Sequence, residues 1–125
     1  MKSMDLVIFA RFHARAGQEQ VLASVLREQV KPVRNEPGCI EIGAYASARD
    51  HRLYFIHSRW TDGAAFEAHA NLPRTLQFIE PVEGLIDHAL DVSRAQKIAW
   101  RASRPSTFAL IVTCDLPHVA QARWR

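Results

Sequence analysis

A chain of 125 residues, 48% of them hydrophobic, is long enough for one domain with its own apolar core. Its two cysteines are too few for a disulfide framework, and no apolar run is long enough to span a membrane, so we expect a reduced, cytoplasmic protein without membrane association. The formal net charge of +3 comes from residues 101–125, which contain four arginines and one acidic residue: Arg101, Arg104, Arg123, Arg125 and Asp115. Because residues 1–100 are neutral overall, nucleic acid is not an expected partner.

The chain begins with a predicted strand followed by a helix. Residues 5–13 (DLVIFARFH) are strand formers, and their alternation places Arg11 on one face with Phe9. Over residues 18–35 the apolar side chains recur at helical spacing. Pro32 lies inside this stretch, and we expect it to kink or divide the helix.

Two further strands follow, joined by a polar connection. Residues 39–47 predict a strand with Ile40 and Ile42 on the same face, and residues 52–61 predict the next strand. One face of this third strand carries Tyr54, Ile56, Ser58 and Trp60. The opposite face carries Leu53, Phe55, His57 and Arg59.

The remaining chain predicts two short helices and a strand. Asp62 is a suitable cap for a helix over residues 64–70, and a second helix is expected over 74–84 after an interrupting proline. Residues 86–98 alternate apolar and polar types and predict a last strand. The apolar run at 108–114 could add one strand to a free sheet edge.

The order strand, helix, strand, strand, helix, strand is typical of an α+β, ferredoxin-like fold with an antiparallel sheet. Right-handed crossovers place both helical connections on one side of that sheet. The other side would leave large apolar side chains in water, and we therefore expect a homodimer in which two sheets pack face to face. We assign residues 1–100 to this domain and 101–125 to a basic C-terminal extension.

Two segments carry a resemblance to a known family. One is the turn Glu36-Pro37-Gly38-Cys39, and the other runs from Trp60 through a short helix to His69. Together they resemble the antibiotic biosynthesis monooxygenase family, in particular its quinol monooxygenase type, over roughly residues 5 to 99. The resemblance implies a dimeric α+β barrel, with two subunits packed through their sheets.

The resemblance implies site residues around the same tryptophan and histidine. His69 is the predicted proton acceptor, although a histidine at a helix end can also serve only to bond free carbonyl groups. Trp60 is the predicted wall that stacks on a flat ligand with its indole N–H free to bond it, and the alternative is ordinary core packing. Arg11 could stabilise an anion, or it could form a salt bridge at the barrel rim.

The predicted pocket differs from the family pattern at one position. The family usually has an acidic residue two positions before the tryptophan, and this chain has Ser58, which cannot act as a base without further activation. Phe66, Phe78 and Tyr54 are expected walls of the pocket or the core. The six histidines show no close pairing typical of a metal site, so we expect no metal. The resemblance implies that no other cofactor is needed either, because the substrate itself supplies the electrons.

The leading functional prediction is a cofactor-independent monooxygenase or quinol oxidase that uses dioxygen and a small aromatic or polyphenolic substrate. An alternative, favoured by Ser58, is a dimer of the same fold that binds a ligand or acts in a stress response without turnover. A second alternative is an isomerase of a small phosphorylated or keto compound. That activity would need a basic pocket, of which Arg11 with Arg59 is the only sign.

Overall fold

The structure, a computed structural model, describes residues 5–99. Along the chain the elements are β1 (Leu6–His13), α1 (Glu19–Val33), β2 (Cys39–Ala46), β3 (Leu53–Trp60), α2 (Gly63–Ala70), α3 (Pro73–Leu85) and β4 (Asp91–Ala95). The predicted order is confirmed, including two helices in the second crossover. The strand predicted over 108–114 lies outside the described residues. None of the helices between residues 5 and 99 is long and apolar enough to cross a bilayer.

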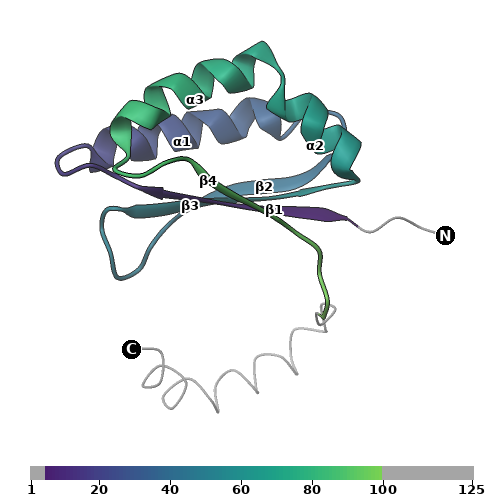
Figure 1. Cartoon of the computed structure of the whole chain (residues 1–125), viewed down its shortest axis with the longest axis horizontal. Helices are drawn as coiled ribbons and strands as arrows, with labels where there is room; N and C mark the ends of the chain where they lie inside the picture. The colour runs from purple at the N-terminus through teal and green to yellow at the C-terminus, as the bar shows by residue number, and fades with distance from the viewer. Residues whose placement is uncertain (1–4, 100–125) are drawn as a thin grey trace.

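The four strands form one antiparallel sheet in the order β2-β3-β1-β4. The central pair is β1 and β3, whose register aligns Leu6 with Trp60 and His13 with Leu53. Figure 1 shows α1, α2 and α3 together on one side of the sheet, as right-handed crossovers require. The ferredoxin-like α+β fold predicted from the order of elements is therefore confirmed.

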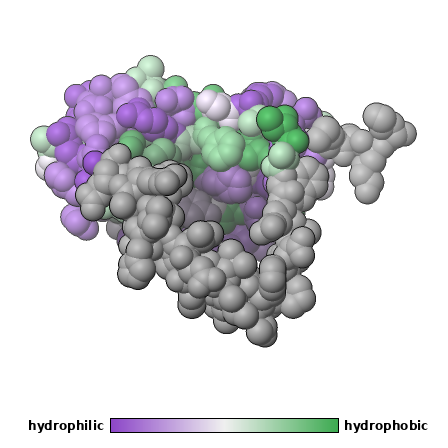
Figure 2. Space-filling model, turned by 90° about the horizontal axis from the view of Figure 1, so that it is seen from below, coloured by the Kyte–Doolittle hydropathy of each residue, from purple (hydrophilic) through white to green (hydrophobic). Residues whose placement is uncertain are grey.

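The other side of the sheet is not covered by any helix of the described chain (Figure 1). Phe9 and Phe55 of the central strands are 51% and 36% exposed there, and Tyr45 of the edge strand β2 is 55% exposed. His57 lies beside Phe9, with 5.3 Å between their ring centroids. Figure 2 views this side and shows hydrophobic residues between hydrophilic margins. We refer to Phe9, Tyr45, Phe55 and His57 as the open face.

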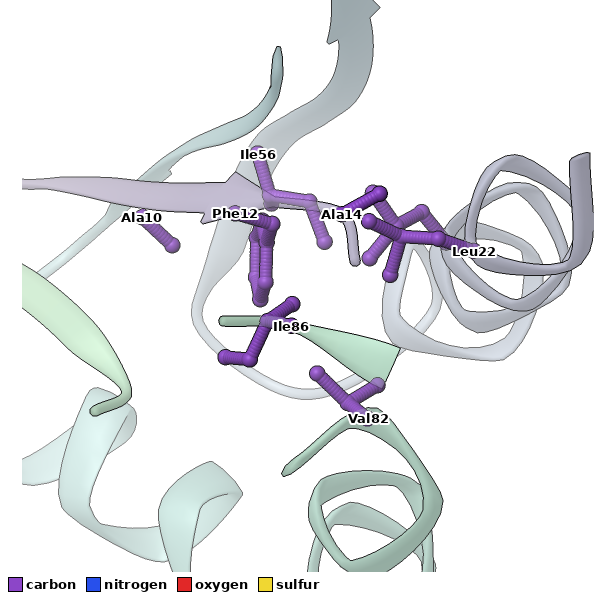
Figure 3. Packing of buried hydrophobic residues seen from close by; sticks show 8 residues of the cluster. Ala10, Phe12, Ala14, Leu22, Ile56, Val82 and Ile86 are labelled. Atoms are coloured by element: carbon purple, nitrogen blue, oxygen red, sulfur yellow. The ribbon is translucent and has the colours of Figure 1, made fainter. Parts of the chain in front are cut away.

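The core fills the space between the sheet and the helices. Its larger cluster consists of Ala10, Phe12, Ala14, Leu22, Leu26, Ile56, Val82 and Ile86. Figure 3 shows Phe12 extending from β1 toward Ile86 and Val82, so one aromatic ring joins the sheet to the end of α3. Burying a side chain of this kind contributes about 1.5–3 kcal/mol. A second cluster of Ile8, Val33 and Trp60 lies under α2.

Helix α1 is continuous through its proline. Pro32 lies in the last turn, where the backbone N–H that it lacks would have reached Glu28, and the next turn is still closed by a bond of 3.1 Å from Arg34 N–H to Val30 O. The loss of one bond so near the end does not interrupt the helix. Of the two predicted effects of Pro32, the division of the helix is therefore wrong, while a kink stays a prediction; the helix ends at Val33.

Strand β2 contains an irregularity that alternation alone does not predict. Cys39 is paired with Trp60 and Glu41 with Arg59, so Ile40 is an extra residue in the ladder. Cys39 and Ile42 pack against the cluster of Trp60, whereas Ile40 is 39% exposed. The expectation that Ile40 and Ile42 lie on the same face is therefore wrong, because a bulge shifts the alternation by one residue.

Strand β4 is shorter than the predicted strand over residues 86–98. Ile86 forms a single bridge with Ala14, and regular pairing with β1 resumes only at Asp91. Between these points the side chain of His88 accepts the backbone N–H of His13 through Nε2 at 2.8 Å. The imidazole of His88 therefore accepts the N–H of His13, which in a continuous ladder would have been bonded to a backbone carbonyl.

The turn at Gly38 yields a prediction about stability. Gly38 has φ +83, and an added Cβ would lie 2.4 Å from Cβ of Ala65 in α2; Gly17 has φ +85 with nothing within 4 Å. Gly17→Ala should cost about 1–2 kcal/mol from the left-handed backbone alone. Gly38→Ala should cost about 1–3 kcal/mol more, because α2 must also move. Urea unfolding of both variants measures the difference, and equal costs would contradict the steric part of the prediction.

Candidate functional site

A cavity of about 260 Å³ lies between the sheet and the helices. Most of its wall is apolar, and the residues that line it are Ile8, Ala10, Phe12, Gln29, Val33, Ile42, Ile56, Ser58, Phe66, His69, Ala70, Thr75, Phe78, Ile79, Leu90 and Val92. Its polar members are Gln29, Ser58, His69 and Thr75. An engineered apolar cavity of about 150 Å³ can hold benzene, so this cavity suits one substituted aromatic ring.

The histidine of this cavity is held by a buried carboxylate. Nδ1 of His69 lies 2.7 Å from Oε1 of Glu36, whose side chain is only 5% exposed. The other oxygen, Oε2, accepts a hydrogen bond of 2.7 Å from Nη2 of Arg74. An ionised carboxylate can only accept, so His69 donates through Nδ1, and the neutral form of the ring carries its lone pair on Nε2. Within the described residues Nε2 has no hydrogen-bond partner, and the ring lies in the cavity wall.

The turn after α1 places Glu36 at this position. Glu36 N–H bonds to Val33 O at 3.0 Å, and Glu36 O accepts from Cys39 N–H at 3.1 Å, so the turn is closed on both sides of the residue. Gly38 O then accepts Thr61 N–H at 2.9 Å, which joins this turn to the start of α2. Because Gly38 has no side chain, α2 can pack directly on the turn. His69, one residue before the end of α2, therefore reaches Glu36.

An aromatic stack supports the histidine from the sheet side. The ring of Trp60 lies 4.9 Å from that of His69 at 31°, and Phe66 lies edge-on to Trp60 at 5.8 Å. The indole N–H of Trp60 donates to Oγ of Ser58 at 3.0 Å. The guanidinium of Arg94 lies 5.1 Å above the ring of Phe66. The imidazole is thus fixed by the carboxylate at one edge and by rings on its face.

Four of the seven predicted site residues line this cavity, namely Ser58, Phe66, His69 and Phe78. Trp60 is fully buried behind His69 instead of forming the wall, and its indole N–H is bonded to Ser58. The expectation that this N–H is free for a ligand is therefore wrong. Tyr54 packs on the core cluster and bonds to His51 O at 3.3 Å. Arg11 is exposed and pairs in register with Phe55, so it lies on the opposite side of the sheet.

Sequence reasoning missed Glu36 as a site residue. Its place before Pro37 and Gly38 indicated only the turn, and a contact with a residue 33 positions away leaves no local pattern. Gln29 and Thr75 were missed as well. Both occupy buried positions of helices, at 8% and 5% exposure, and a polar side chain on the apolar stripe of a predicted helix is the signal that could have identified them.

A second group of ionisable side chains lies at the far end of β1. Nδ1 of His13 is 2.8 Å from Asp87, and Nε2 is 3.3 Å from Asp50. The hydrogen bond with His13 lowers the pKa of Asp87, and a backbone bond from Arg52 lowers the pKa of Asp50. Among residues 5–99 no group of three or more histidine, cysteine or acidic residues is arranged to hold a metal ion. Burial raises the pKa of the Cys39 thiol, which favours its neutral form.

Solved structures of similar fold cover most of the described chain. PA3566 from Pseudomonas aeruginosa is 28% identical, with a TM-score of 0.73 over 79% of this chain and 99% of that chain. Rv0793 from Mycobacterium tuberculosis is 23% identical, with a TM-score of 0.72 over 78% of this chain and 99% of that chain. A structure of an antibiotic biosynthesis monooxygenase is 17% identical, with a TM-score of 0.70 over 75% and 99%. Among curated proteins none matches significantly.

The family comparison agrees with the motifs and with the fold. The model of the antibiotic biosynthesis monooxygenase family matches residues 5–81, which include β1, the turn at Glu36, the stack of Trp60 with His69, and most of α3. This match covers more than half of the chain. The protein therefore belongs to the antibiotic biosynthesis monooxygenase family.

Proposed function

We propose that this protein is an oxidoreductase that uses dioxygen to oxidise a small aromatic compound of the quinol type without a metal or organic cofactor. The observation that carries the proposal is a histidine in the wall of an apolar cavity, with one ring nitrogen fixed on buried Glu36 and the other without a protein partner. Membership of the monooxygenase family supports the reaction class.

The cavity matches the demands of such a reaction. A deprotonated quinol can pass one electron to dioxygen, which gives a semiquinone radical and superoxide. If a second electron follows, the products are quinone and hydrogen peroxide. If the two radicals recombine instead, the product is oxygenated. The substrate supplies the electrons, so the protein must remove a proton and exclude water. Nε2 of His69 can accept the proton, and the carboxylate of Glu36 then stabilises the imidazolium that forms.

The other predicted roles follow from position. Ser58 can donate its own hydroxyl proton to a substrate oxygen, because its Oγ already accepts from Trp60. Phe66 and Phe78 are the aromatic walls that contact the ring of the substrate. Arg11 lies across the sheet, so charge stabilisation by Arg11 is not a step of the reaction within one subunit. The basic pocket that a phosphorylated isomerase substrate needs is not formed by Arg11 and Arg59, since Arg59 pairs with Asp5 and Glu41.

A homodimer is part of this proposal. The open face exposes large apolar side chains at the centre of a sheet, and no described helix covers them (Figure 1). Two copies packed face to face around a two-fold axis would remove this surface from water. Burial of apolar area, at about 25 cal/mol per Å², is the favourable contribution to this association.

Oxygen consumption with a panel of quinols tests the reaction. We expect the wild-type protein to consume dioxygen with at least one quinol, and His69→Gln to lower kcat by about 10²–10⁴-fold because the proton acceptor is lost. His51→Gln is the control, since this histidine is 79% exposed and away from the cavity. Binding of quinols without any oxygen consumption would favour the alternative of a ligand-binding protein without turnover.

The tautomer of His69 can be tested through Glu36. In Glu36→Gln, Arg74 can only donate and should take the amide oxygen, which leaves the new NH₂ group facing Nδ1 of His69. The ring proton should then move to Nε2 and abolish the proton acceptor, so turnover should fall by roughly 10³-fold while quinol binding is retained. Nitrogen NMR of the ring reports the tautomer. Glu41→Gln is the matched control, and an unchanged tautomer in Glu36→Gln would contradict this assignment.

The dimer predicts a change of mass on substitution of the open face. Phe9→Lys places a charge at its centre and should convert the protein to a monomer, or lower its association constant by at least a hundredfold. Leu76→Lys is the control, because Leu76 is 54% exposed on α3 and outside the open face. Light scattering at micromolar concentration measures both. A folded wild-type monomer under these conditions would rule out the dimer.

A further inference from the structure

Gln29 is a buried polar side chain that the proposed reaction does not use. It lies on α1, is 8% exposed and lines the cavity. Its side-chain amide has no hydrogen-bond partner among residues 5–99. Since no buried side-chain nitrogen or oxygen of the described residues lacks a hydrogen-bond partner, the unpaired amide of Gln29 reaches solvent-accessible space. Its two N–H donors and its acceptor oxygen are therefore open to a bound molecule, and a molecule that covered them without a hydrogen bond would bind less favourably.

The other polar groups of the cavity already have protein partners. Ser58 accepts from Trp60, Thr75 Oγ1 lies 3.4 Å from Nδ1 of His69, and that nitrogen is held by Glu36. Among the polar residues of the wall, Gln29 is the one whose side chain has no hydrogen-bond partner within residues 5–99, while Nε2 of His69 and the hydroxyl proton of Ser58 are also open to a ligand. Gln29 belongs to α1 and His69 to α2, and both line the cavity.

We propose that Gln29 recognises a second oxygen of the substrate, an aromatic diol whose first hydroxyl gives its proton to His69. This inference rests on the proposed function for its choice of ligand. An amide suits such a substrate in both of its oxidation states. Its oxygen accepts from the hydroxyl of the quinol, and its NH₂ group donates to the carbonyl of the quinone.

Gln29 lines the cavity, whereas a second glutamine, Gln77, does not. Gln29 and Phe78 line both the cavity and an outer groove between α1 and α3, whereas Gln77 lines the groove only. A substrate oxygen bonded to Gln29 would therefore lie at the helix side of the cavity. Gln77 offers the same chemistry outside the cavity and is the matched control.

Binding of benzene-1,4-diol and of phenol, which lacks the second oxygen, tests the role of Gln29 directly. Wild-type protein should bind the diol roughly tenfold or more tightly than phenol, because phenol would cover the amide of Gln29 without forming a hydrogen bond with it. Gln29→Met keeps the length of the side chain and removes its polar atoms, and should reduce this preference to about twofold or less. Gln77→Met should keep it. Calorimetric titration under argon prevents oxidation of the diol.

The outcomes separate this inference from the proposed function. The role of Gln29 is overturned if Gln29→Met still binds the diol more tightly than phenol. It is also overturned if the wild-type protein binds both compounds equally or binds neither. A preference that Gln29→Met removes, in a protein that consumes no dioxygen, supports the role of Gln29 and contradicts the proposed oxidation. Gln29→Leu provides a second apolar variant, and circular dichroism shows that each variant is folded. Where turnover occurs, Gln29→Met should raise KM for the diol more than it lowers kcat.

Discussion

The architecture of the site depends on one buried carboxylate shared between two partners. Glu36 places Oε1 on His69 and Oε2 on Arg74, both at 2.7 Å, with almost none of its side chain in water. A charge buried in this way is tolerated only when it is paired and hydrogen-bonded, and removing one partner of such a pair typically costs about 3–5 kcal/mol. Because Glu36 follows α1, His69 belongs to α2 and Arg74 to α3, this single side chain joins all three helices.

The same contact explains why the tight turn is needed. Glycine at position 38 has a positive φ, a backbone conformation that lets the chain reverse tightly after α1. Its second consequence is tertiary, since the missing Cβ lets α2 approach the turn and brings His69 to Glu36. The turn motif and the tryptophan–histidine segment, which are separate in the sequence, therefore form one structural unit. A resemblance that depends on both segments reflects this packing.

How much could be predicted from the sequence differed between the fold and the site. Hydrophobic periods of 2 and 3.6, with the cap at Asp62 for α2, were sufficient to predict the order of elements in the described chain. They could not reveal the bulge at Ile40, the late start of β4 at Asp91 or the continuity of α1 through Pro32, which depend on pairing and on single hydrogen bonds. In the site, Ser58 stands where the family pattern has a carboxylate. Glu36 supplies a carboxylate from another element, and no local pattern connects it with His69.

The alternation of side chains across the sheet also determines how the charges of the site are arranged. Arg11 lies on the same side of the sheet as Phe9 and Phe55, whereas Ser58 and Trp60 face the helices. The guanidinium of Arg11 and the cavity are therefore on opposite sides of the sheet. The ionised groups that hold the imidazole, Glu36 and Arg74, do not line the cavity themselves. A neutral, electron-rich ring can enter such an apolar space without losing strong hydration, whereas a phosphorylated compound would be left with an unpaired buried charge. The charge of the site is thus buried on Glu36 behind His69, and not in the cavity wall beside the ligand. This arrangement favours an aromatic substrate.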